Sequence, residues 1–598
     1  MKSKKVQAKA KPAKITLPRS PKREDGRGSV WSGAFTGTYA LIGIAALIAF
    51  LWAYSPVMHT EFLFDDTKQV FALSSGSSTL RSWIGVIRPV LMATYWFNNQ
   101  LGPDTASYHA VNLVIHALAA ALVFLIVRRL AEWAEIESRK RDVLAAFAAA
   151  LFLLHPAQTE SVAYIAGRSE SLSGMFACAA FAAFLYRGTV AISWLRTGAV
   201  VLLALAAMLS KEQAVVLFAL FLLTDFWWNP GLSNSRFSLK GILGNWRLYL
   251  PLLAGAAAAV ALFAKLIMGI GTGGSAGFGM KDFTWYQYLF TQFRGIWVYI
   301  FNFVLPANLN VDQEFPISRS IVDHGAIVGL IGLAGLAVAA WMMRRRFRLA
   351  AFGYFMFLLL LAPTSSILPI KDPVADRRLY LPMIGLLLIV VDFASRLKLT
   401  RQALATSCAV VAAISALATH ARAEVWSDPV TLWEDSTRKS PGKSRAHFQL
   451  GFAYMSRQQF DRAVPEFEKA AALTTPDVDL LVDWGLAYGG LHQPDKALEK
   501  LRAAAALEPT AHIYSQIGKV LAEQNRYAEA MDAFNMSLRL DSKFVASYAY
   551  RGLVLLAIGD AARAIPEFQH ALTLDPMFEP AREGLLQAQR AVQSRGGR

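Results

Sequence analysis

Long apolar runs recur along the first 420 residues of this chain and constrain its fold more than any other feature. A run of about 17–25 apolar residues is long enough to cross the hydrocarbon core of a bilayer as a helix. The chain has 598 residues, is 55% hydrophobic and has a mean hydropathy of +0.36, which is too apolar for a soluble protein of this size. We expect membrane spans near 34–54, 107–127, 143–156, 171–187, 197–210, 213–228, 248–269, 324–343, 349–364, 379–395 and 402–420.

The distribution of positive charge sets the expected direction of these spans. The net charge is +17, and much of the excess lies in the tail 1–30 and in short loops such as "RRRFR" at 344–348. Basic loops stay on the cytoplasmic side of a membrane, and a basic tail rich in Pro and Ser is typical of disorder. We therefore expect a disordered cytoplasmic tail, and topology explains the charge better than nucleic-acid binding does.

Four basic stretches agree on one topology. They are the tail, "RRL" with "ESRKRD" at 128–142, "RRRFR", and "SRLKLTR" at 395–401. All four lie inside if the aromatic-rich segment 285–306 does not cross fully, or crosses as a hairpin; this segment suits an interfacial helix. The result is about eleven crossings, with everything after residue 420 outside. A twelfth crossing would place that part in the cytoplasm.

A period of 33–34 residues marks the last part of the chain. Glycines recur at this spacing, at Gly451, Gly485, Gly518 and Gly552. An alanine follows each glycine by twelve residues, and Phe or Leu follows four later. This is the tetratricopeptide pattern, in which small residues let paired helices approach and a large residue fills the gap. We expect four repeats, a leading half-unit at 425–441, a capping helix at 580–593, and a concave face that binds a peptide or partner protein.

The expected external loops collect ionisable and polar side chains next to the span ends. The set comprises Asp65, Asp66 and Arg88, then His155, Glu160 and Arg168, then Lys211 and Glu212, and finally Asp376, Arg377, Arg378 and Tyr380. Charged groups near hydrocarbon are costly, so a function is the default expectation for such a set. External arginines also run against the positive-inside trend, which suggests an anionic partner such as a lipid phosphate.

This set contains both parts needed for glycosyl transfer from a polyprenyl phosphate. Cationic side chains would neutralise the leaving phosphate, and a carboxylate would take the proton of the acceptor hydroxyl. Adjacent Asp65 and Asp66 cannot both face the acceptor in an extended loop. One would be the base, and we favour Asp66; the other would orient the loop, bind the acceptor or hold a cation. The expected phosphate-binding residues are Arg168, Arg377, Arg378 and Lys211. The expected supporting residues are Arg88, His155, Glu160, Glu212, Asp376 and Tyr380.

Several stretches carry a resemblance to a known family. They are "FLFDDTKQV", "LFLLHPAQTESVAYIAGRSESLSGMF", "LSKEQAVVL", "VADRRLYLPMIG" and "WSDPVTLWEDS". In this order, and followed by the repeats, they resemble the transmembrane and tetratricopeptide-repeat proteins, which in animals are O-mannosyltransferases of the GT-C superfamily and have bacterial relatives. The resemblance implies a GT-C fold, a polyprenyl-phosphate sugar donor and an inverting mechanism. It places the acidic motif on Asp65 and Asp66, and it leaves Asp376 where Glu is more usual.

We therefore predict an all-α chain with three parts: the tail 1–30, a GT-C-like transmembrane catalytic domain at 31–422 and a tetratricopeptide-repeat domain at 423–598. The expected partners are a polyprenyl-phosphate-linked sugar, an acceptor protein held by the repeats, and the bilayer. The sequence indicates no particular cofactor, and a divalent cation is compatible with the carboxylates. The expected location is a bacterial inner membrane, with the N-terminus cytoplasmic and the active site and repeats periplasmic.

Two other functions stay open at this point. A ligase would move a preassembled oligosaccharide from a lipid pyrophosphate, and it would need a larger cavity for its donor. A non-catalytic assembly factor would use the repeats to recruit partners, and its Asp65 and Asp66 would be dispensable.

Overall fold

The computed structural model describes residues 37–64, 66, 79–84, 88–102, 104–187, 191–228, 237, 239–267 and 276–596. The expected disordered tail at 1–30 and the candidate base Asp65 lie outside the described residues. The chain divides into two compact units, Met1–Ile48 and Ala49–Arg598, and every contact discussed below lies within the second.

The first part of the chain consists of helices, with long connections between α12 and α13 and between α14 and α15. Their bounds are α1 (Gly37–Ala53), α2 (Leu80–Ile84), α3 (Pro89–Leu101), α4 (Thr105–Trp133), α5 (Ser138–Leu154), α6 (Thr159–Ala163), α7 (Arg168–Leu185), α8 (Trp194–Ser210), α9 (Leu217–Trp227), α10 (Lys240–Gly244), α11 (Trp246–Ile267), α12 (Trp285–Val304), α13 (Ala326–Met343), α14 (Arg348–Leu361), α15 (Met383–Ser395) and α16 (Arg401–Trp426). Short 3₁₀ helices are η3 (Pro156–Gln158), η4 (Glu212–Val216) and η6 (Asp376–Leu379). The described residues contain no strand, so the all-α prediction is confirmed.

Each of the eleven predicted spans coincides with one of these helices. Among the described residues, α4, α16 and the segment 323–343 that contains α13 are long and apolar enough to cross a membrane. A fourth span results if α5 and the segment 156–163, bent by 51° at His155, are taken together. The other apolar helices are shorter, so the number of crossings stays a prediction.

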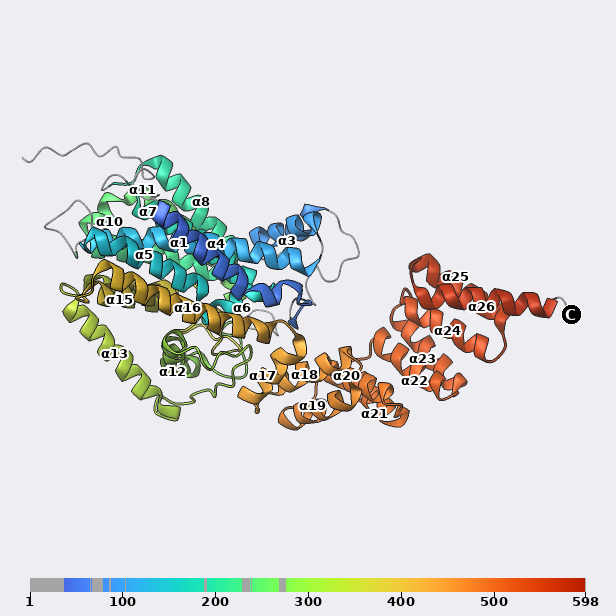
Figure 1. The fold of residues 1–598 in the computed structure, drawn as a ribbon. Coiled ribbons are helices and arrows are strands. Elements are labelled where there is room, and N and C mark those ends of the chain that lie inside the picture. Colours follow the sequence, from blue (N-terminus) through green and yellow to red (C-terminus); the bar gives the residue numbers. More distant parts are fainter. Residues whose placement is uncertain are drawn as a thin grey trace, which may run out of the picture. The chain divides into compact units, whose positions relative to one another are not determined.

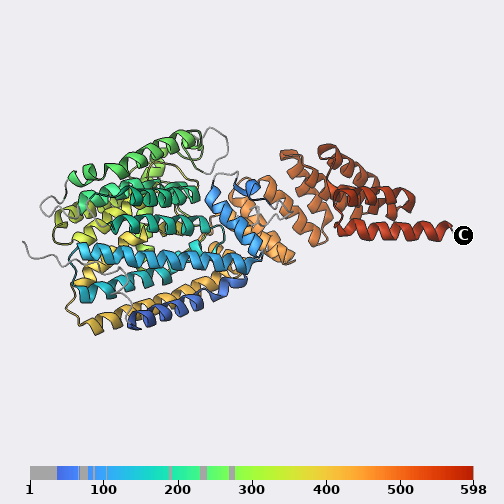
Figure 2. The same ribbon diagram turned by 90° about the horizontal axis from the view of Figure 1, so that it is seen from above.

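The bundle has one large hydrophobic core and a smaller one around α3, and its helices pack closely. α5 lies between α4 and α16, and α7 packs on α4 (Figures 1 and 2). At the crossing of α14 and α15, a Cβ added to Gly353 would lie 2.4 Å from the carbonyl oxygen of Gly385. Glycine is therefore required there, as at many close helix crossings in membranes.

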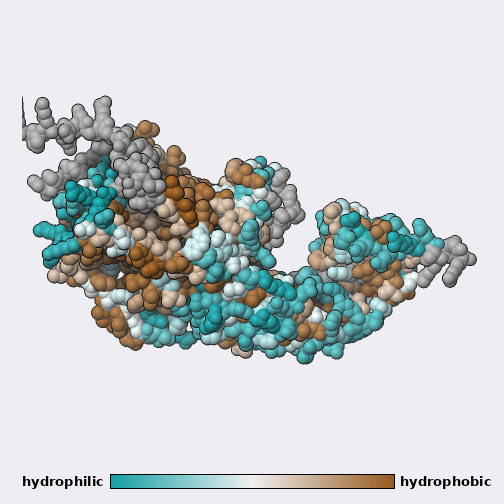
Figure 3. Space-filling model, in the orientation of Figure 1, coloured by the Kyte–Doolittle hydropathy of each residue, from teal (hydrophilic) through white to brown (hydrophobic). Residues whose placement is uncertain are grey.

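Apolar side chains also cover part of the bundle's surface. α13 exposes Val328 at 70%, Ile331 at 64% and Met342 at 74%, and α16 exposes a similar row. Figure 3 shows these hydrophobic areas on the bundle, whereas the repeats are mostly hydrophilic. An exposed apolar area of this kind indicates contact with lipid.

The basic stretches meet at one end of the bundle, which we call the Arg345 end. Lys140, at the start of α5, donates to the carbonyls of Ser395 (3.1 Å) and Leu397 (2.8 Å) after α15. Arg348, at the start of α14, donates to the carbonyl of Trp133 at the end of α4 (3.4 Å). The stretches 128–142, 344–348 and 395–401 therefore lie at the same end of the bundle, as we expect for basic stretches on one side of a membrane.

Helix α12 lies along the opposite end, which we call the Asp376 end. Side chains from both ends of α12 contact the segment 364–376. Tyr288 donates to the carbonyl of Thr364 (2.6 Å), and Gln292 donates to that of Pro373 (2.9 Å). Asn302 donates to the Asp376 carboxylate (2.9 Å). One continuous helix occupies 285–304, so the hairpin alternative for this segment is wrong. The row of contacts along one end favours the alternative in which the segment does not cross.

The C-terminal helices form the predicted repeats. They are α17 (Pro429–Lys439), α18 (Ser444–Ser456), α19 (Phe460–Leu473), α20 (Val478–Gly490), α21 (Pro494–Leu507), α22 (Ala511–Glu523), α23 (Tyr527–Leu540), α24 (Val545–Ala557), α25 (Ala561–Leu574) and α26 (Glu579–Gly596). A Cβ on Gly451, Gly518 or Gly552 would lie 2.6 Å from the Phe sixteen residues later, and one on Gly485 would lie 2.9 Å from Leu501. The predicted pairing of small and large residues is confirmed.

Candidate functional site

The loop after α5 is a compact buried structure built from its own motif residues. His155 ends α5: its Nδ1 accepts from the backbone N–H of Ala157 (3.2 Å), and its Nε2 donates to the carbonyl of Phe303 in α12 (3.0 Å). A Cβ on Gly167 would lie 2.7 Å from the carbonyl oxygen of Glu160, so only glycine fits before α7. The motif therefore places Glu160 and Arg168 at fixed positions of the Asp376 end.

Asp66 holds the first loop against this motif. Its Oδ1 accepts from the backbone N–H of Ala166 (2.8 Å), and its Oδ2 accepts from that of Leu63 (3.2 Å). The side chain is 1% exposed. Our preference for Asp66 as the base is therefore not supported, because both oxygens already accept backbone hydrogen bonds. Of the two roles expected within the pair, Asp66 fits the one that orients the loop.

Arg168 is a buried structural residue and does not face a ligand space. It is 0% exposed, and its guanidinium donates to the side-chain oxygens of Asn112 (2.7 Å) and Asn98 (2.8 Å) and to the carbonyl of Tyr108 (3.0 Å). It also lies over the Tyr95 ring, 4.6 Å from the centroid. The expected phosphate-binding role does not fit these contacts, and we assign Arg168 to joining α3, α4 and α7.

Arg378 likewise serves the loop in which it lies. It is 7% exposed and donates to the carbonyl oxygens of Pro373 (2.7 Å) and Asp372 (2.5 Å). Tyr380 is deeper still, with its hydroxyl 2.9 Å from Nδ1 of His116 inside the bundle. Both residues therefore position the segment after α14, and neither is placed to bind a donor.

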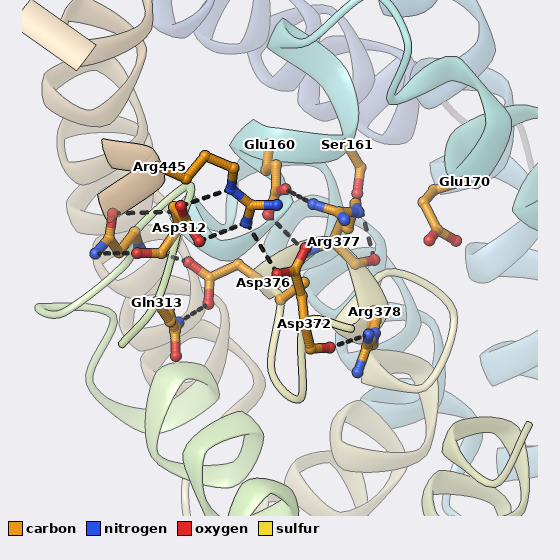
Figure 4. A network of polar contacts seen from close by, with 12 residues as sticks. Glu160, Ser161, Glu170, Asp312, Gln313, Asp372, Asp376, Arg377, Arg378 and Arg445 are labelled. Atoms are coloured by element: carbon orange, nitrogen blue, oxygen red, sulfur yellow. Dashed lines mark hydrogen bonds and ion pairs between the residues drawn. The ribbon is translucent and has the colours of Figure 1, made fainter. Parts of the chain in front are cut away.

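Arg377 is partly exposed at this end and pairs with a buried carboxylate. Its backbone N–H donates to Oε2 of Glu160 (2.9 Å), and its Nη1 forms an ion pair with Oε1 of the same carboxylate (Figure 4). Its side chain is 30% exposed, while that of Glu160 is 4% exposed. Within the described part of the chain, the other guanidinium nitrogens of Arg377 have no hydrogen-bond partner. They are available to an anion.

Lys211 lies close enough to Arg88 and Arg377 for their positive charges to act on it. Lys211 forms an ion pair with Glu170, and Arg88 donates twice to Glu212, at 3.1 and 2.8 Å. Burial lowers the pKa of Lys211; Glu170 opposes this effect, and the nearby Arg88 and Arg377 add to it. Three cations thus face three carboxylates, and the charges balance before any ligand binds.

Asp376 organises the segment 305–323 rather than contacting Arg377. Its carboxylate accepts from Asn302 Nδ2 (2.9 Å), the backbone N–H of Asn310 (2.8 Å) and Gln313 Nε2 (2.7 Å) (Figure 4). Burial, together with the negative charge of Glu160, raises the pKa of Asp376 to about 7. Its role is therefore structural, and its charge is sensitive to pH near neutrality.

This pKa predicts a pH-dependent stability. The folded protein holds the Asp376 proton up to about pH 7, whereas the unfolded chain loses it near the ordinary value of 3.8. Because the folded state then binds more protons between these values, the free energy of unfolding falls as the pH rises through this window, by about 4 kcal/mol at most. Thermal unfolding in detergent from pH 4.5 to 8 should record the fall, and Asp376→Asn should flatten it. An unchanged slope in that variant would contradict this assignment.

The first repeat is tied to the Asp376 end by a cluster that the sequence did not reveal. Arg445 of α18 donates to Asp312 (2.8 and 2.5 Å) and to Asp372 (2.9 Å) (Figure 4). Asp312 is 2% exposed and also has Lys443 at 3.4 Å. The only hint in the sequence is the acidic stretch "NVDQE" at 310–314, which follows an aromatic helix.

Phe64 completes this connection from the first loop. Its ring packs edge-on against Trp433 (centroids 5.7 Å apart) and lies near Tyr164 (6.4 Å), and Arg445 lies 5.6 Å over it. Phe64 thus packs against both the bundle core and the repeat core. Its φ of 48° is unusual for a bulky residue, and such strain persists only where surrounding contacts fix it.

Removing Arg445 should therefore affect both parts of the protein. In Arg445→Ala the buried Asp312 keeps only Lys443 as a cation. We expect the free energy of unfolding to fall by about 1–3 kcal/mol, below the 3–5 kcal/mol typical of a fully buried pair because Arg445 is partly exposed. Arg438→Ala, which removes a 74% exposed arginine from α17, is the matched control. Thermal unfolding measures the effect, and an equal unfolding temperature for Arg445→Ala and Arg438→Ala would contradict it.

A cavity of about 380 Å³ opens between Phe64 and the repeats. We call it the repeat cavity. Aromatic side chains line one part of it, Phe64, Phe448 and Phe452, and carboxylates line another, Asp479, Asp483 and Glu508. The first loop thus contributes Phe64, the residue before Asp65, to a cavity on the repeats.

No group of three His, Cys, Asp or Glu side chains in the described ranges is arranged to hold a metal ion.

Comparison with known proteins gives two independent results. The tetratricopeptide-repeat family matches residues 444–475 and 482–543. Protein O-mannosyl-transferase TMTC3 of Homo sapiens is 23% identical over 539 residues, which cover 82% of this chain and 57% of that protein. Protein O-mannosyl-transferase Tmtc1 of Drosophila melanogaster is 32% identical over 213 residues, 33% of this chain and 24% of the relative. The chain thus spans little more than half the length of the human relative.

Among solved structures, YrrB, described as a tetratricopeptide-repeat protein with an unusual peptide-binding site, matches 26% of this chain and 80% of its own, with 21% identity and a TM-score of 0.23.

Proposed function

We propose that this chain, a homologue of the transmembrane and tetratricopeptide-repeat protein O-mannosyl-transferases, is an integral-membrane glycosyltransferase that moves a sugar from a polyprenyl phosphate to hydroxyl groups of an acceptor protein. One observation at the Asp376 end carries the proposal. Within the part of the chain that the structure describes, Arg377 has guanidinium nitrogens without a hydrogen-bond partner, and the nearby Lys211 ammonium has one ion-pair partner, Glu170. The loop that contains Asp65 is anchored at the same end through Asp66.

In the proposed reaction, Asp65 takes the proton of the acceptor hydroxyl. The hydroxyl oxygen attacks the anomeric carbon, the bond from that carbon to the phosphate oxygen breaks, and the configuration inverts. Arg377 and Lys211 stabilise the negative charge that develops on the leaving polyprenyl phosphate. Asp66 holds the loop in place, so that the proposed base and the two cations keep fixed positions relative to the donor.

The proposal includes a topology. A tail at 1–30, a transmembrane catalytic domain at 31–422 and a repeat domain at 423–598 would place the Asp376 end and the repeats on the periplasmic side of an inner membrane. The Arg345 end would face the cytoplasm. The gathering of three basic stretches at the Arg345 end supports this direction, and the position of α12 along the Asp376 end supports eleven crossings.

The repeat cavity is the proposed place where the acceptor protein binds. Its carboxylates favour a positively charged segment, and its aromatic side chains give an extended chain apolar contact. Because Phe64 precedes Asp65, a segment lying in the cavity would bring a nearby hydroxyl close to the proposed base.

Mass spectrometry of envelope proteins from cells with and without this protein tests the function. The expected result is a set of hydroxyl-linked sugars that is lost without the protein and restored by the wild type. It should not be restored by Asp65→Asn. Loss of a preassembled oligosaccharide would instead identify a ligase, and restoration by Asp65→Asn would identify a scaffold.

A variant of the repeat cavity should separate acceptor binding from chemistry. We expect Phe452→Ser/Glu508→Lys to raise the KM for a protein acceptor by about tenfold or more, the size expected for losing a well-packed interface residue, with little change for a short peptide. Leu540→Ser/Glu523→Lys makes the same kind of change at exposed positions away from the cavity and should change neither. Equal effects of both variants on the protein acceptor would show that the cavity is not the binding place.

A further inference from the structure

A second cavity lies at the Arg345 end of the bundle and takes no part in the proposed reaction. Its volume is about 380 Å³, and we call it the basic cavity. Three connections that are distant in sequence line it: 134–140 between α4 and α5, 345–349 between α13 and α14, and 392–396 at the end of α15. Lys140, Arg345, Arg346, Arg348 and Arg396 line it, against three carboxylates, so it has a surplus of two positive charges.

The carboxylates of the basic cavity leave part of this charge uncompensated. Asp392 accepts from Arg396 Nε (2.8 Å) and, at its other oxygen, from the backbone N–H of Ala350 (2.8 Å). Glu135 lies 3.6 Å from Arg348. Within the described ranges, Arg345 and Arg346 have no ion-pair partner. The guanidinium groups of Arg345 and Arg346 therefore line the basic cavity without an ion pair to any described residue.

Aromatic side chains place this cavity at the level of lipid headgroups. Trp133 ends α4 and lies 6.3 Å from Trp228, which follows α9 (ring centroids). Trp341 lies in the last turn of α13, with the Arg344 guanidinium 4.2 Å over its ring. Tryptophans of membrane proteins gather where hydrocarbon meets headgroups. The basic cavity opens among the helix ends that carry them.

From these observations we infer that the basic cavity binds the phosphate headgroup of an anionic phospholipid. A guanidinium group can donate two parallel hydrogen bonds to the oxygens of one phosphate, and its planar fork matches this geometry. Anionic lipids concentrate positive segments at a membrane surface, and basic pockets between helix ends bind their headgroups. The lipid would bridge three connections that Lys140, Arg348 and Arg396 already join by hydrogen bonds, and it would hold the helix ends together.

This site is independent of the glycosyltransferase proposal, because it lies at the opposite end of the helices. Its test uses the full-length protein in detergent with an equimolar mixture of phosphatidylglycerol and phosphatidylcholine. Native mass spectrometry measures which lipid stays bound. We expect the wild type to retain phosphatidylglycerol, and Arg345→Ala/Arg346→Ala to lose that preference by about tenfold or more, given the contribution of each basic side chain near an anionic lipid.

Arg139→Ala/Lys398→Ala is the matched control, since both residues are exposed, basic and at the same end but outside the cavity. It should keep the preference. A loss of similar size in the control, or an unchanged preference in the Arg345/Arg346 variant, would overturn the inference.

A second measurement does not depend on any variant. Phosphatidylglycerol should raise the thermal unfolding temperature of the wild type more than phosphatidylcholine does. If inorganic phosphate at millimolar concentration gives the same rise, the cavity is a site for small anions and the lipid inference fails.

Discussion

Replacing Asp65 with asparagine should lower the transfer rate by about 10²–10⁴-fold, the usual loss when a general base is removed, while the thermal unfolding temperature stays unchanged. Asparagine keeps the size and much of the hydrogen bonding of the side chain and loses only its basicity. The measurement is the transfer rate at matched protein level, with a polyprenyl-phosphate sugar as donor and a short peptide as acceptor.

Asp66→Asn is the natural partner of this experiment, because it should lower the unfolding temperature, which Asp65→Asn should leave unchanged. An amide oxygen can still accept from one of the two backbone N–H groups that now bind Asp66, but its NH₂ group faces the other. An unsatisfied buried donor costs about 1–3 kcal/mol. The Asp66→Asn variant should therefore unfold at lower temperature and transfer more slowly through loss of loop order. If Asp65→Asn stays within threefold of wild type, the catalytic interpretation of this loop is wrong.

The second large effect is expected at Arg377. Arg377→Lys keeps the charge and loses the planar fork. We expect the KM for the donor to rise by about 10–100-fold, which corresponds to one or two charge-assisted hydrogen bonds, with insertion and folding preserved. Lysine is the better probe here, because Arg377→Ala would also leave the 4% exposed Glu160 side chain without its cation.

Arg378→Lys provides the control one residue away in η6. Arg378 faces inward and holds the carbonyls of Asp372 and Pro373, so its loss should lower the unfolding temperature and leave the donor KM close to that of the wild type. Titrating the donor with each variant separates the two roles. A normal donor KM for Arg377→Lys, or equal KM changes in both variants, would remove Arg377 from the phosphate site.

The helices and repeats of this protein could be predicted because each depends on a local pattern. Apolar runs give helices wherever they occur, and the glycine at Gly451 fixes the place of Phe467 through a spacing within one repeat. The role of a given arginine could not be predicted in this way. Arg168 and Arg377 stand in similar motifs, but the packing of α3 and α4 buries Arg168 completely, whereas Arg377 is 30% exposed.

The same reason explains the change in our view of Asp66. Which member of an adjacent pair turns inward depends on where the backbone N–H of Ala166 lies, and that position is set by a loop a hundred residues away. The partners of Arg445 were missed for a related reason, since Asp312 and Asp372 belong to segments without a motif. Interactions between distant segments are set by the tertiary fold, and a single sequence does not display them.

The ring of Phe64 belongs to two hydrophobic cores at once, and this has a thermodynamic consequence for the proposed reaction. A ligand that stabilises the repeats in their contact with Phe64 also stabilises the loop that continues into Asp65 and Asp66. By linkage, a donor that favours the ordered loop must strengthen acceptor binding by the same factor by which the acceptor strengthens donor binding. Each substrate would then raise the affinity for the other through the contacts of Phe64, without a movement of whole domains.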